Sequence, residues 1–179
     1  GGVTTCCTGP GSANVLGGTF TAIKTVGKRV DKMIVKKEVA MKCAFGENPK
    51  RFYGQQKKSA PFTRTGTAAL LREILYKAKN YMEKKDRGEE PAFDMKLEAM
   101  LPVMRGEIPL KAHAHRCDDI FTSIRIAREF GLKLTLDYCT DVAVIAEELA
   151  KEGYPSFVGP SLGTKSKIEV KSKSFDAPG

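Results

Sequence analysis

The sequence predicts an α/β chain with a parallel β-sheet. Three observations lead to this fold class: six short apolar runs have the length of strands, amphipathic helical patterns separate the later runs, and one strand near residue 110 passes directly into a helix. Alternation of strands and helices is typical of βαβ units, whose strands lie parallel. We therefore expect a single sheet with helices packed against it.

Composition limits the classes of protein to which the chain can belong. Its 179 residues are enough for one domain with a sizeable core, and 41% hydrophobic with 28% charged residues is typical of a soluble globular protein. No apolar run approaches the roughly 20 residues that cross a bilayer, and no signal peptide opens the sequence, so no membrane partner is expected. Five cysteines without disulfide-like spacing favour a reducing compartment, and a cytoplasmic location is expected.

The charge is strongly positive, with a formal net charge of +9 and a pI near 9.3. Such a balance can indicate a nucleic-acid partner. The lysines are spread over the expected helices and the C-terminal tail, however, and no nucleic-acid-binding module is present. We interpret the charge as solvated surface and expect no nucleic acid among the partners.

The first expected strand covers residues 3–8, a β-branched and cysteine-rich run. We expect a buried parallel strand with Cys6 and Cys7 inside and inert. Because it begins at the first residues, without a preceding loop or cap, we expect the chain to be part of a larger protein. The glycine-rich segment 9–18 matches neither phosphate-binding glycine motif and predicts a wide loop leading into a short pattern at residues 19–26.

Two further strand patterns follow, at residues 32–36 and 39–45. Alternation in the second places Lys42 on the face opposite the large apolar side chains. Burying an ammonium group costs several kcal/mol unless it is paired or modified. Lys42 therefore either extends to the rim of the sheet or is a site lysine, and Glu47 in the following turn is a possible partner for it.

The middle of the chain is predominantly helical. Residues 50–65 are polar and basic and predict an irregular excursion. Apolar residues at helical spacing predict a long helix at residues 67–85 and a shorter one at residues 94–104.

Pro109 opens the next expected strand, which ends in the two histidines of the chain, His113 and His115. Residues two apart in a strand point to the same face, about 7 Å from each other. A strand that ends in two imidazoles and turns into a helix can present metal ligands or an acid–base group. The alternative is two histidines that make ordinary hydrogen bonds, and the pair alone does not decide between them.

The rest of the chain continues the alternation. A helix capped by Asp118 or Asp119 is expected to end at Gly131. It is followed by a strand at residues 132–139, a helix at 142–151 broken by Gly153, and a short strand at 155–158. We expect residues 1–160 to form the α/β portion and residues 161–179 to be a basic tail that is poorly ordered or covers a sheet edge.

Four segments, in this order and at this spacing, resemble the imidazolonepropionase-like branch of the metal-dependent amidohydrolases. The segments are residues 3–14 (VTTCCTGPGSAN), 41–49 (MKCAFGENP), 110–116 (LKAHAHR) and 136–140 (LDYCT). Members of this family are (β/α)8 barrels of the TIM type that hydrolyse amide or other C–N bonds with one or two divalent metals, often zinc. The resemblance implies an incomplete parallel barrel here, with six strands that correspond to the second through seventh.

The resemblance also implies site residues. Lys42 stands where the family has a metal-bridging carboxylated lysine, and His113 where it has a ligand histidine. Tyr138 stands where it expects another histidine, and tyrosine is a poor zinc ligand. The remaining residues, Glu47, His115 and Arg116, are expected to support the site or bind substrate, with Arg116 suited to a substrate carboxylate. The first-strand HxH and the last-strand aspartate of the family are missing, so no catalytic residue is assigned.

Two hypotheses from different classes follow. The chain is a portion of a metal-dependent amidohydrolase acting on a small-molecule substrate, inactive by itself, with zinc binding that is weak or absent. Alternatively, it is a non-catalytic α/β domain that binds a small anion or a protein partner. Because six of eight strands leave two open edges, we expect a homodimer, and the alternative is a monomer whose tail covers an edge.

Overall fold

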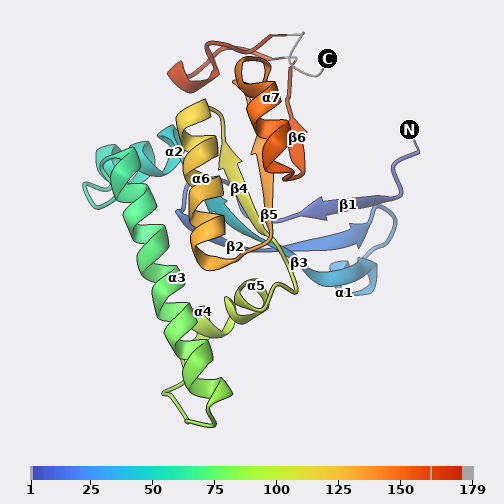
Figure 1. Cartoon of the computed structure of the whole chain (residues 1–179). Helices are drawn as coiled ribbons and strands as arrows, with labels where there is room; N and C mark the ends of the chain where they lie inside the picture. Colours follow the sequence, from blue (N-terminus) through green and yellow to red (C-terminus); the bar gives the residue numbers. More distant parts are fainter. Residues whose placement is uncertain (1, 162, 175–179) are drawn as a thin grey trace.

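A computed structural model describes residues 2–161 and 163–174, which form one six-stranded sheet with helices (Figure 1). The strand order follows the sequence, from β1 to β6. β3 to β6 are parallel, whereas β2 pairs antiparallel with both β1 and β3. The sheet is therefore mixed, and the expected parallel arrangement holds only for its last four strands. The strands are β1 (Thr5–Thr8), β2 (Leu16–Lys24), β3 (Ile34–Ala44), β4 (Leu110–Ala114), β5 (Leu134–Tyr138) and β6 (Ser156–Val158).

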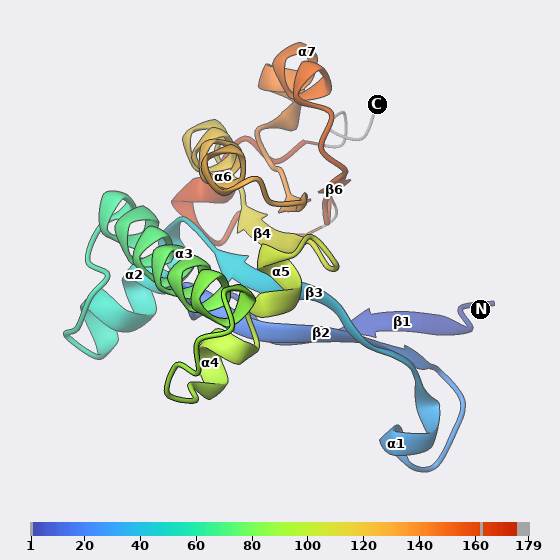
Figure 2. The ribbon, with the colours of Figure 1, turned by 60° about the horizontal axis from the view of Figure 1, so that its bottom comes forward.

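The N-terminal strands differ most from the expectation. The expected loop and short pattern between residues 9 and 26 contain the nine-residue strand β2, and the two strand patterns at 32–36 and 39–45 belong to one long strand, β3. A short helix, α1 (Val30–Met33), precedes β3. β1, β2 and the first half of β3 form a ribbon that extends beyond the helical layer (Figure 2). Every residue of β1 is exposed in this ribbon, so the expectation of buried Cys6 and Cys7 is wrong.

The helices lie largely where their periodicity places them. They are α2 (Glu47–Lys50), the π-helical turn Arg51–Gln56, α3 (Arg64–Asp86), α4 (Met95–Glu98), α5 (Leu101–Met104), α6 (Cys117–Phe130), α7 (Val142–Glu152) and the 3-10 turn Ile168–Val170. The helix expected at residues 94–104 is two short helices, because Pro102 lies in the first turn of α5 and has no N–H to continue α4. None of the helices in the described ranges is long and apolar enough to cross a membrane.

The ends of α6 show how tertiary contacts replace a local cap. Neither Asp118 nor Asp119 is the N-cap, since the helix already begins at Cys117. Its first N–H donates instead to Oδ2 of Asp141, 3.0 Å away, from the turn after β5. The other end is as predicted: Gly131 ends α6 and Gly153 ends α7, both in the left-handed conformation that glycine adopts without steric cost.

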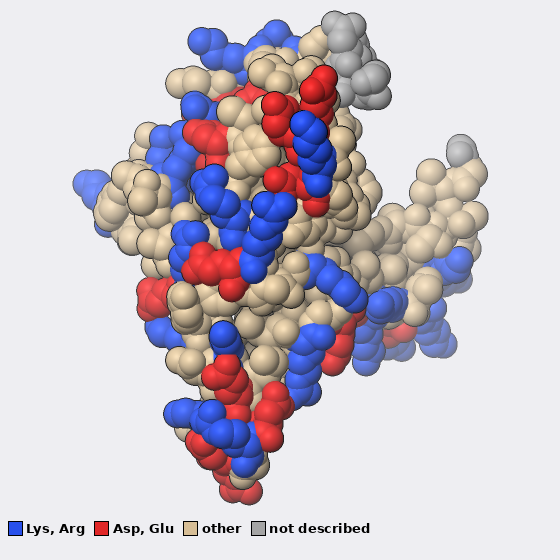
Figure 3. Space-filling model, viewed as in Figure 1, with Lys and Arg blue, Asp and Glu red and all other residues tan. Residues whose placement is uncertain are grey.

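The hydrophobic core lies between one face of the sheet and the helices α3, α5 and α6 (Figure 1). Alternation along the strands supplies it, because every second side chain of β3, β4 and β5 points toward the helices. The core members of these strands include Met41, Cys43, Leu110, Ala112, Leu134 and Leu136. On the outer surface, lysines and arginines alternate with acidic side chains along α3 (Figure 3).

The C-terminal segment (residues 163–174) contacts the turns that follow β3 and β5. Lys167 donates to Oδ1 of Asn48 at 2.5 Å, and Ser172 donates to Asp141. Its 3-10 turn buries Glu169 and Val170. This part of the basic tail therefore lies over the carboxyl ends of the strands and contributes a buried carboxylate there.

Replacing Leu71 of α3 with alanine is expected to lower the free energy of unfolding by about 2–5 kcal/mol, because its fully buried side chain leaves a cavity in the core. Urea denaturation measures the change. The matched control is Val144→Ala on α7, where 76% of the residue is exposed and a change of less than about 0.5 kcal/mol is expected. Equal effects at the two positions would contradict the described core.

Candidate functional site

The polar residues of β3, β4 and β5 converge on the face of the sheet opposite the helices. Lys42 of β3 is in register with Lys111 of β4, and His113 of β4 with Asp137 of β5. In the pleat, Lys111 and His113 lie two residues apart and share a face. The inner face of the half-barrel therefore carries charged and imidazole side chains on three neighbouring strands.

An ion-pair cluster occupies the centre of this face. Nζ of Lys42 lies 2.8 Å from Oδ2 of Asp137, and Nζ of Lys111 lies 2.6 Å from Oδ1 of the same carboxylate. Only 4% of the Lys42 side chain is exposed. The suggested pairing of Lys42 with Glu47 is wrong, because Asp137 shares the inner face with Lys42 whereas Glu47 lies in α2, where its N–H donates to Glu169. The sequence did not reveal Asp137 as a site residue, although a carboxylate inside the apolar strand 132–139 indicates a buried charge that needs a partner.

The two histidines lie side by side at the carboxyl end of β4, as their spacing predicts. Their ring centroids are 4.8 Å apart, and the Tyr138 ring lies 4.5 Å from His113 and 5.0 Å from His115. Nδ1 of His115 is 2.8 Å from Oγ1 of Thr140, and Nε2 of His113 is 3.2 Å from the side-chain nitrogen of Asn48. These contacts fix the orientation of both buried rings.

Glu169 completes a group that the sequence did not reveal. Its Oε1 lies 3.9 Å from Nε2 of His115, and its Oε2 accepts from the N–H of Glu47 at 2.7 Å. One ligand atom each from His113, His115 and Glu169 lie within 4.8 Å of one another. The carboxylate comes from a segment without strong strand or helix periodicity, so no pattern in the sequence linked it to the histidines.

Burial keeps both imidazoles neutral at physiological pH. Desolvation, with added repulsion from His115, Lys42 and Lys167, lowers the pKa of His113 to about 2. Desolvation, with repulsion from Lys167 and Lys173, lowers the pKa of His115 to about 4. Burial raises the pKa of Glu169, although the hydrogen bond from the Glu47 N–H opposes this shift. Neutral imidazole is the form that binds a metal ion.

The residues of this group fit a divalent cation chemically. Two imidazoles and one carboxylate make up a donor set that zinc uses in catalytic sites. Within the described part of the chain, Nδ1 of His113 and Oε1 of Glu169 are buried without a hydrogen-bond partner. Buried polar atoms normally have a partner, so these two atoms are available to a ligand. Nearby positive charges oppose a cation: the ammonium of Lys167 lies 3.5 Å from Oε1 of Glu169, and the guanidinium of Arg64 lies 3.6 Å from Oε2.

Tyr138 and Arg116 lie at the border of the site. Tyr138 has a φ of 78°, a conformation that is rare and strained for an aromatic residue, and this turn directs its ring against both histidines. Nε and one terminal nitrogen of Arg116 each lie 3.0 Å from the carboxylate of Asp118, on the surface. The guanidinium fork suggested for a substrate carboxylate is therefore engaged by a neighbouring side chain.

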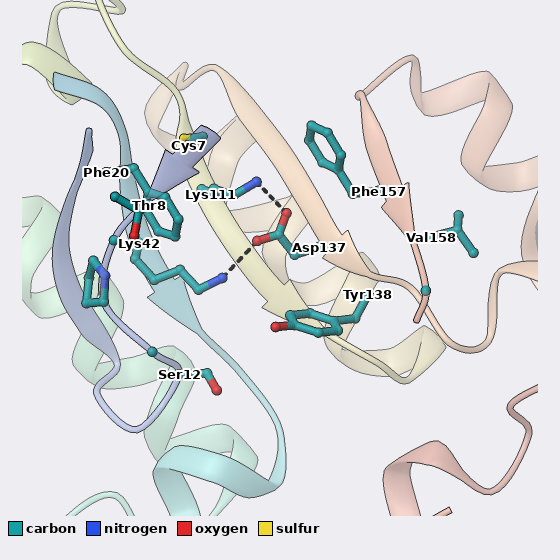
Figure 4. A pocket seen from close by; sticks show the side chains of 14 residues that line it. Cys7, Thr8, Ser12, Phe20, Lys42, Lys111, Asp137, Tyr138, Phe157 and Val158 are labelled. Carbon is teal, nitrogen blue, oxygen red and sulfur yellow. Dashed lines mark hydrogen bonds and ion pairs between the residues drawn. The ribbon is translucent and has the colours of Figure 1, made fainter. Parts of the chain in front are cut away.

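A cavity of about 570 Å³ opens on the inner face beside this group (Figure 4). Lys42, Lys111 and Asp137 lie at its centre, and Phe20 of β2 and Phe157 of β6 lie on opposite sides of it. Tyr138 also lines it, so that one ring contacts both the cavity and the histidines. A volume of this size is typical of small-molecule sites.

Replacing Gly46 with alanine is expected to displace the carboxylate of Glu169 and to destabilise the fold. Gly46 has a φ of 81°, and an added Cβ would collide with Oε2 of Glu169 and lie 3.2 Å from Oδ2 of Asp119. The matched control is Gly88→Ala, which has a similar φ of 77° but no atom within 4 Å of the new Cβ. We expect about 1–2 kcal/mol of destabilisation at Gly88 and clearly more at Gly46, measured by urea denaturation. Equal losses would contradict the packing of Glu169 on Gly46.

The two histidines also predict how stability changes with pH. Because the folded state lowers both pKa values below the ordinary 6.5, their contribution is complete above pH 6.5 and is lost as the pH falls toward 4 for His115 and 2 for His113. His113 alone should cost about 1.4 kcal/mol per pH unit below 6.5, and His115 should add less. Urea denaturation between pH 7.5 and 5 tests this, and the double variant His113→Gln/His115→Gln should show a shallower slope. An unchanged slope would rule out buried neutral histidines.

Two known amidohydrolases are similar to this chain. No protein-family model matches the chain. Amidohydrolase tasK from Hapsidospora irregularis is 29% identical over 154 residues, which are 73% of this chain and 16% of that protein. The crystal structure of an amidohydrolase from Thermotoga maritima MSB8 superposes with a TM-score of 0.92 and 44% sequence identity, over 97% of this chain and 46% of that one.

The match to the solved structure covers nearly all of this chain but less than half of the other. The expected incomplete parallel barrel of six strands is a six-stranded mixed half-barrel sheet with its helices, because β2 pairs antiparallel with β1 and β3. Both relatives are amidohydrolases by name, which confirms the amidohydrolase type predicted from the sequence motifs. By sequence and by fold, the chain is of the amidohydrolase type.

Proposed function

We propose that this chain forms part of a metal-dependent hydrolase that cleaves an amide or another C–N bond of a small substrate. The hydrolase family rests on the two amidohydrolase relatives. The observation that carries the proposal further is the buried group of His113, His115 and Glu169 at the carboxyl end of β4, whose ligand atoms lie within 4.8 Å of one another. In barrels of this kind, the carboxyl ends of the strands hold the chemistry.

His113, His115 and Glu169 are the residues that would hold the cation, with zinc the best match to two imidazoles and a carboxylate. Lys42 as a further ligand stays a prediction, because its ammonium group donates to Asp137 in this arrangement. When bound, a divalent cation supplies Lewis acidity for the scissile carbonyl and lowers the pKa of water.

The protein side chains around this group position and shield it. Thr140 holds the His115 ring through Nδ1, and Asn48 contacts the His113 ring through Nε2. Such outer contacts fix ring orientation at metal centres. Tyr138 covers both rings from the side of the cavity, and the C-terminal segment closes the site from above the strand ends. Because Asp137 is bonded to two lysines, it is not free to act as a general base, and no catalytic base is assigned.

The second candidate function is a non-catalytic α/β domain that binds a small anion. Tyr138 in place of a ligand histidine favours it, as does the cluster of two lysines around one aspartate in the cavity. Metal binding distinguishes the two functions, since only the hydrolase requires it.

Zinc titration of the metal-free chain in competition with a chromophoric chelator tests the proposal. We expect one equivalent to bind, more weakly than at closed four-ligand sites, because the chain offers three ligands. Glu169→Gln and His113→Gln should each weaken binding at least about tenfold, since loss of outer contacts alone costs 10–100-fold. Lys167→Met should strengthen binding, because it removes the cation 3.5 Å from Glu169.

Glu90→Gln, an exposed position after α3, is the control and should bind zinc like the parent chain. If the parent chain binds no zinc, or if Glu169→Gln binds as tightly as the parent, the proposed metal group is wrong. We expect no turnover of small amides by the isolated chain, because the family's first-strand histidines and last-strand aspartate are absent from it.

A further inference from the structure

Three charged side chains from distant segments meet beside the candidate metal group. Arg64 is the first residue of α3, Asp119 lies in the first turn of α6, and Glu169 comes from the C-terminal segment. Nε of Arg64 donates to Oδ2 of Asp119 at 3.0 Å, and a terminal nitrogen of Arg64 lies 3.6 Å from Oε2 of Glu169. One guanidinium group therefore bridges two carboxylates whose side chains are only 5% and 0% exposed, an arrangement called here the guanidinium bridge.

The two carboxylate oxygens of Glu169 have different surroundings. Oε2 faces the guanidinium bridge and also accepts from the N–H of Glu47 at 2.7 Å. Oε1 lies 3.9 Å from Nε2 of His115 and has no hydrogen-bond partner among the described residues. Contacts with the rest of the chain thus fix one oxygen, and the other oxygen is directed to the histidines.

The charges of the bridge explain the use of two carboxylates. A guanidinium paired with Glu169 alone would cancel the negative charge that attracts a divalent cation. Asp119 provides Arg64 with a counter-ion, and its contact is the shorter of the two, 3.0 Å against 3.6 Å. The three side chains together therefore retain one negative charge, while Arg64 still contacts Oε2 of Glu169.

We propose that Arg64 and Asp119 are positioning residues of the candidate metal group. Arg64 orients Glu169 so that Oε1 faces the histidines, and Asp119 holds Arg64 and cancels its charge. The inference rests on the proposed function, because the group that these residues position is the proposed cation site. Both act through Glu169, in the way that outer contacts orient ligands at metal centres.

Amide hydrogen exchange of Glu47 tests the positioning without a metal ion. Glu47 is the first residue of α2, so its N–H has no acceptor within the helix and depends on Oε2 of Glu169 for protection. NMR in the presence of EDTA measures this exchange in the parent chain and in Arg64→Gln/Asp119→Asn. We expect exchange at least about tenfold faster in the variant, and a smaller change for the amides of β4, because only the support of Glu169 is removed.

Zinc affinity and the visible spectrum of bound Co²⁺ test the orientation of Oε1. Arg64→Gln/Asp119→Asn removes one positive and one negative charge, so the net charge stays the same and only the bridge is lost. We expect zinc affinity to fall about tenfold or more, and the cobalt spectrum to approach that of Glu169→Gln.

Asp119→Asn alone provides a second, milder test. It keeps the shape of the side chain and an oxygen that accepts from Arg64, so it carries the test if the double variant does not fold. The guanidinium is then left without its own counter-ion beside Glu169, and zinc affinity should again fall about tenfold or more. Unchanged zinc affinity would show that Asp119 does not compensate Arg64.

The matched control is Arg72→Gln/Glu129→Gln. It removes an arginine–carboxylate pair of 2.7 Å between the same two helices, α3 and α6, near the other end of α6. Zinc affinity, the cobalt spectrum and Glu47 exchange should all match those of the parent chain. If the guanidinium bridge only stabilises the fold, Arg64→Gln/Asp119→Asn should lower the urea midpoint but leave zinc affinity and the cobalt spectrum unchanged, which would overturn the proposal.

Separate outcomes would disprove the metal group and the positioning role. If the parent chain binds neither zinc nor cobalt, the metal group is wrong, and faster Glu47 exchange in the double variant would still show that Arg64 and Asp119 position Glu169. If the double variant binds zinc as tightly as the parent and gives the same cobalt spectrum, the metal group stands and the positioning role is wrong. Unchanged Glu47 exchange would contradict the positioning role in either case.

Discussion

The two-residue alternation of the parallel strands β3, β4 and β5 is the constraint on which the rest of the structure depends. It directs apolar side chains such as Leu110 and Leu136 toward the helices and directs Lys111, His113 and Asp137 to the inner face. A charged group on a nearly buried face needs a partner from a neighbouring strand. The Lys42–Asp137 pair satisfies this need across β4, and it brings residues 95 positions apart in the sequence together.

The same constraint explains why the inner face has two chemically different halves. Deeper in the sheet, lysines and aspartate form an ion cluster next to the open cavity. At the carboxyl ends of the strands, the two imidazoles are neutral because burial lowers their pKa values. The carboxylate of Glu169, from the C-terminal segment, lies beside them. Tyr138 stands between the halves and contacts both, in a backbone conformation that costs free energy.

Glu169 depends on a backbone feature as much as on its charge. The N–H of Glu47 and the guanidinium of Arg64 stabilise its carboxylate, and the missing side chain of Gly46 leaves room for it. Without these contacts, a carboxylate with so little exposure would not remain in place. The turn after β3 therefore serves the site although it contributes no ligand to the proposed cation.

The sequence by itself determined the strands β4 to β6, the helices α3, α6 and α7, and the shared face of His113 and His115, because these follow from periodicities of two and 3.6 residues. It also indicated the amidohydrolase type through short motifs. Only the tertiary structure decided that β1 is exposed and pairs antiparallel with β2, that Asp137 rather than Glu47 pairs with Lys42, and that Glu169 joins the histidines. Each of these depends on which distant segments meet in space, and a local pattern contains no information about a partner that lies 54 or 95 residues away.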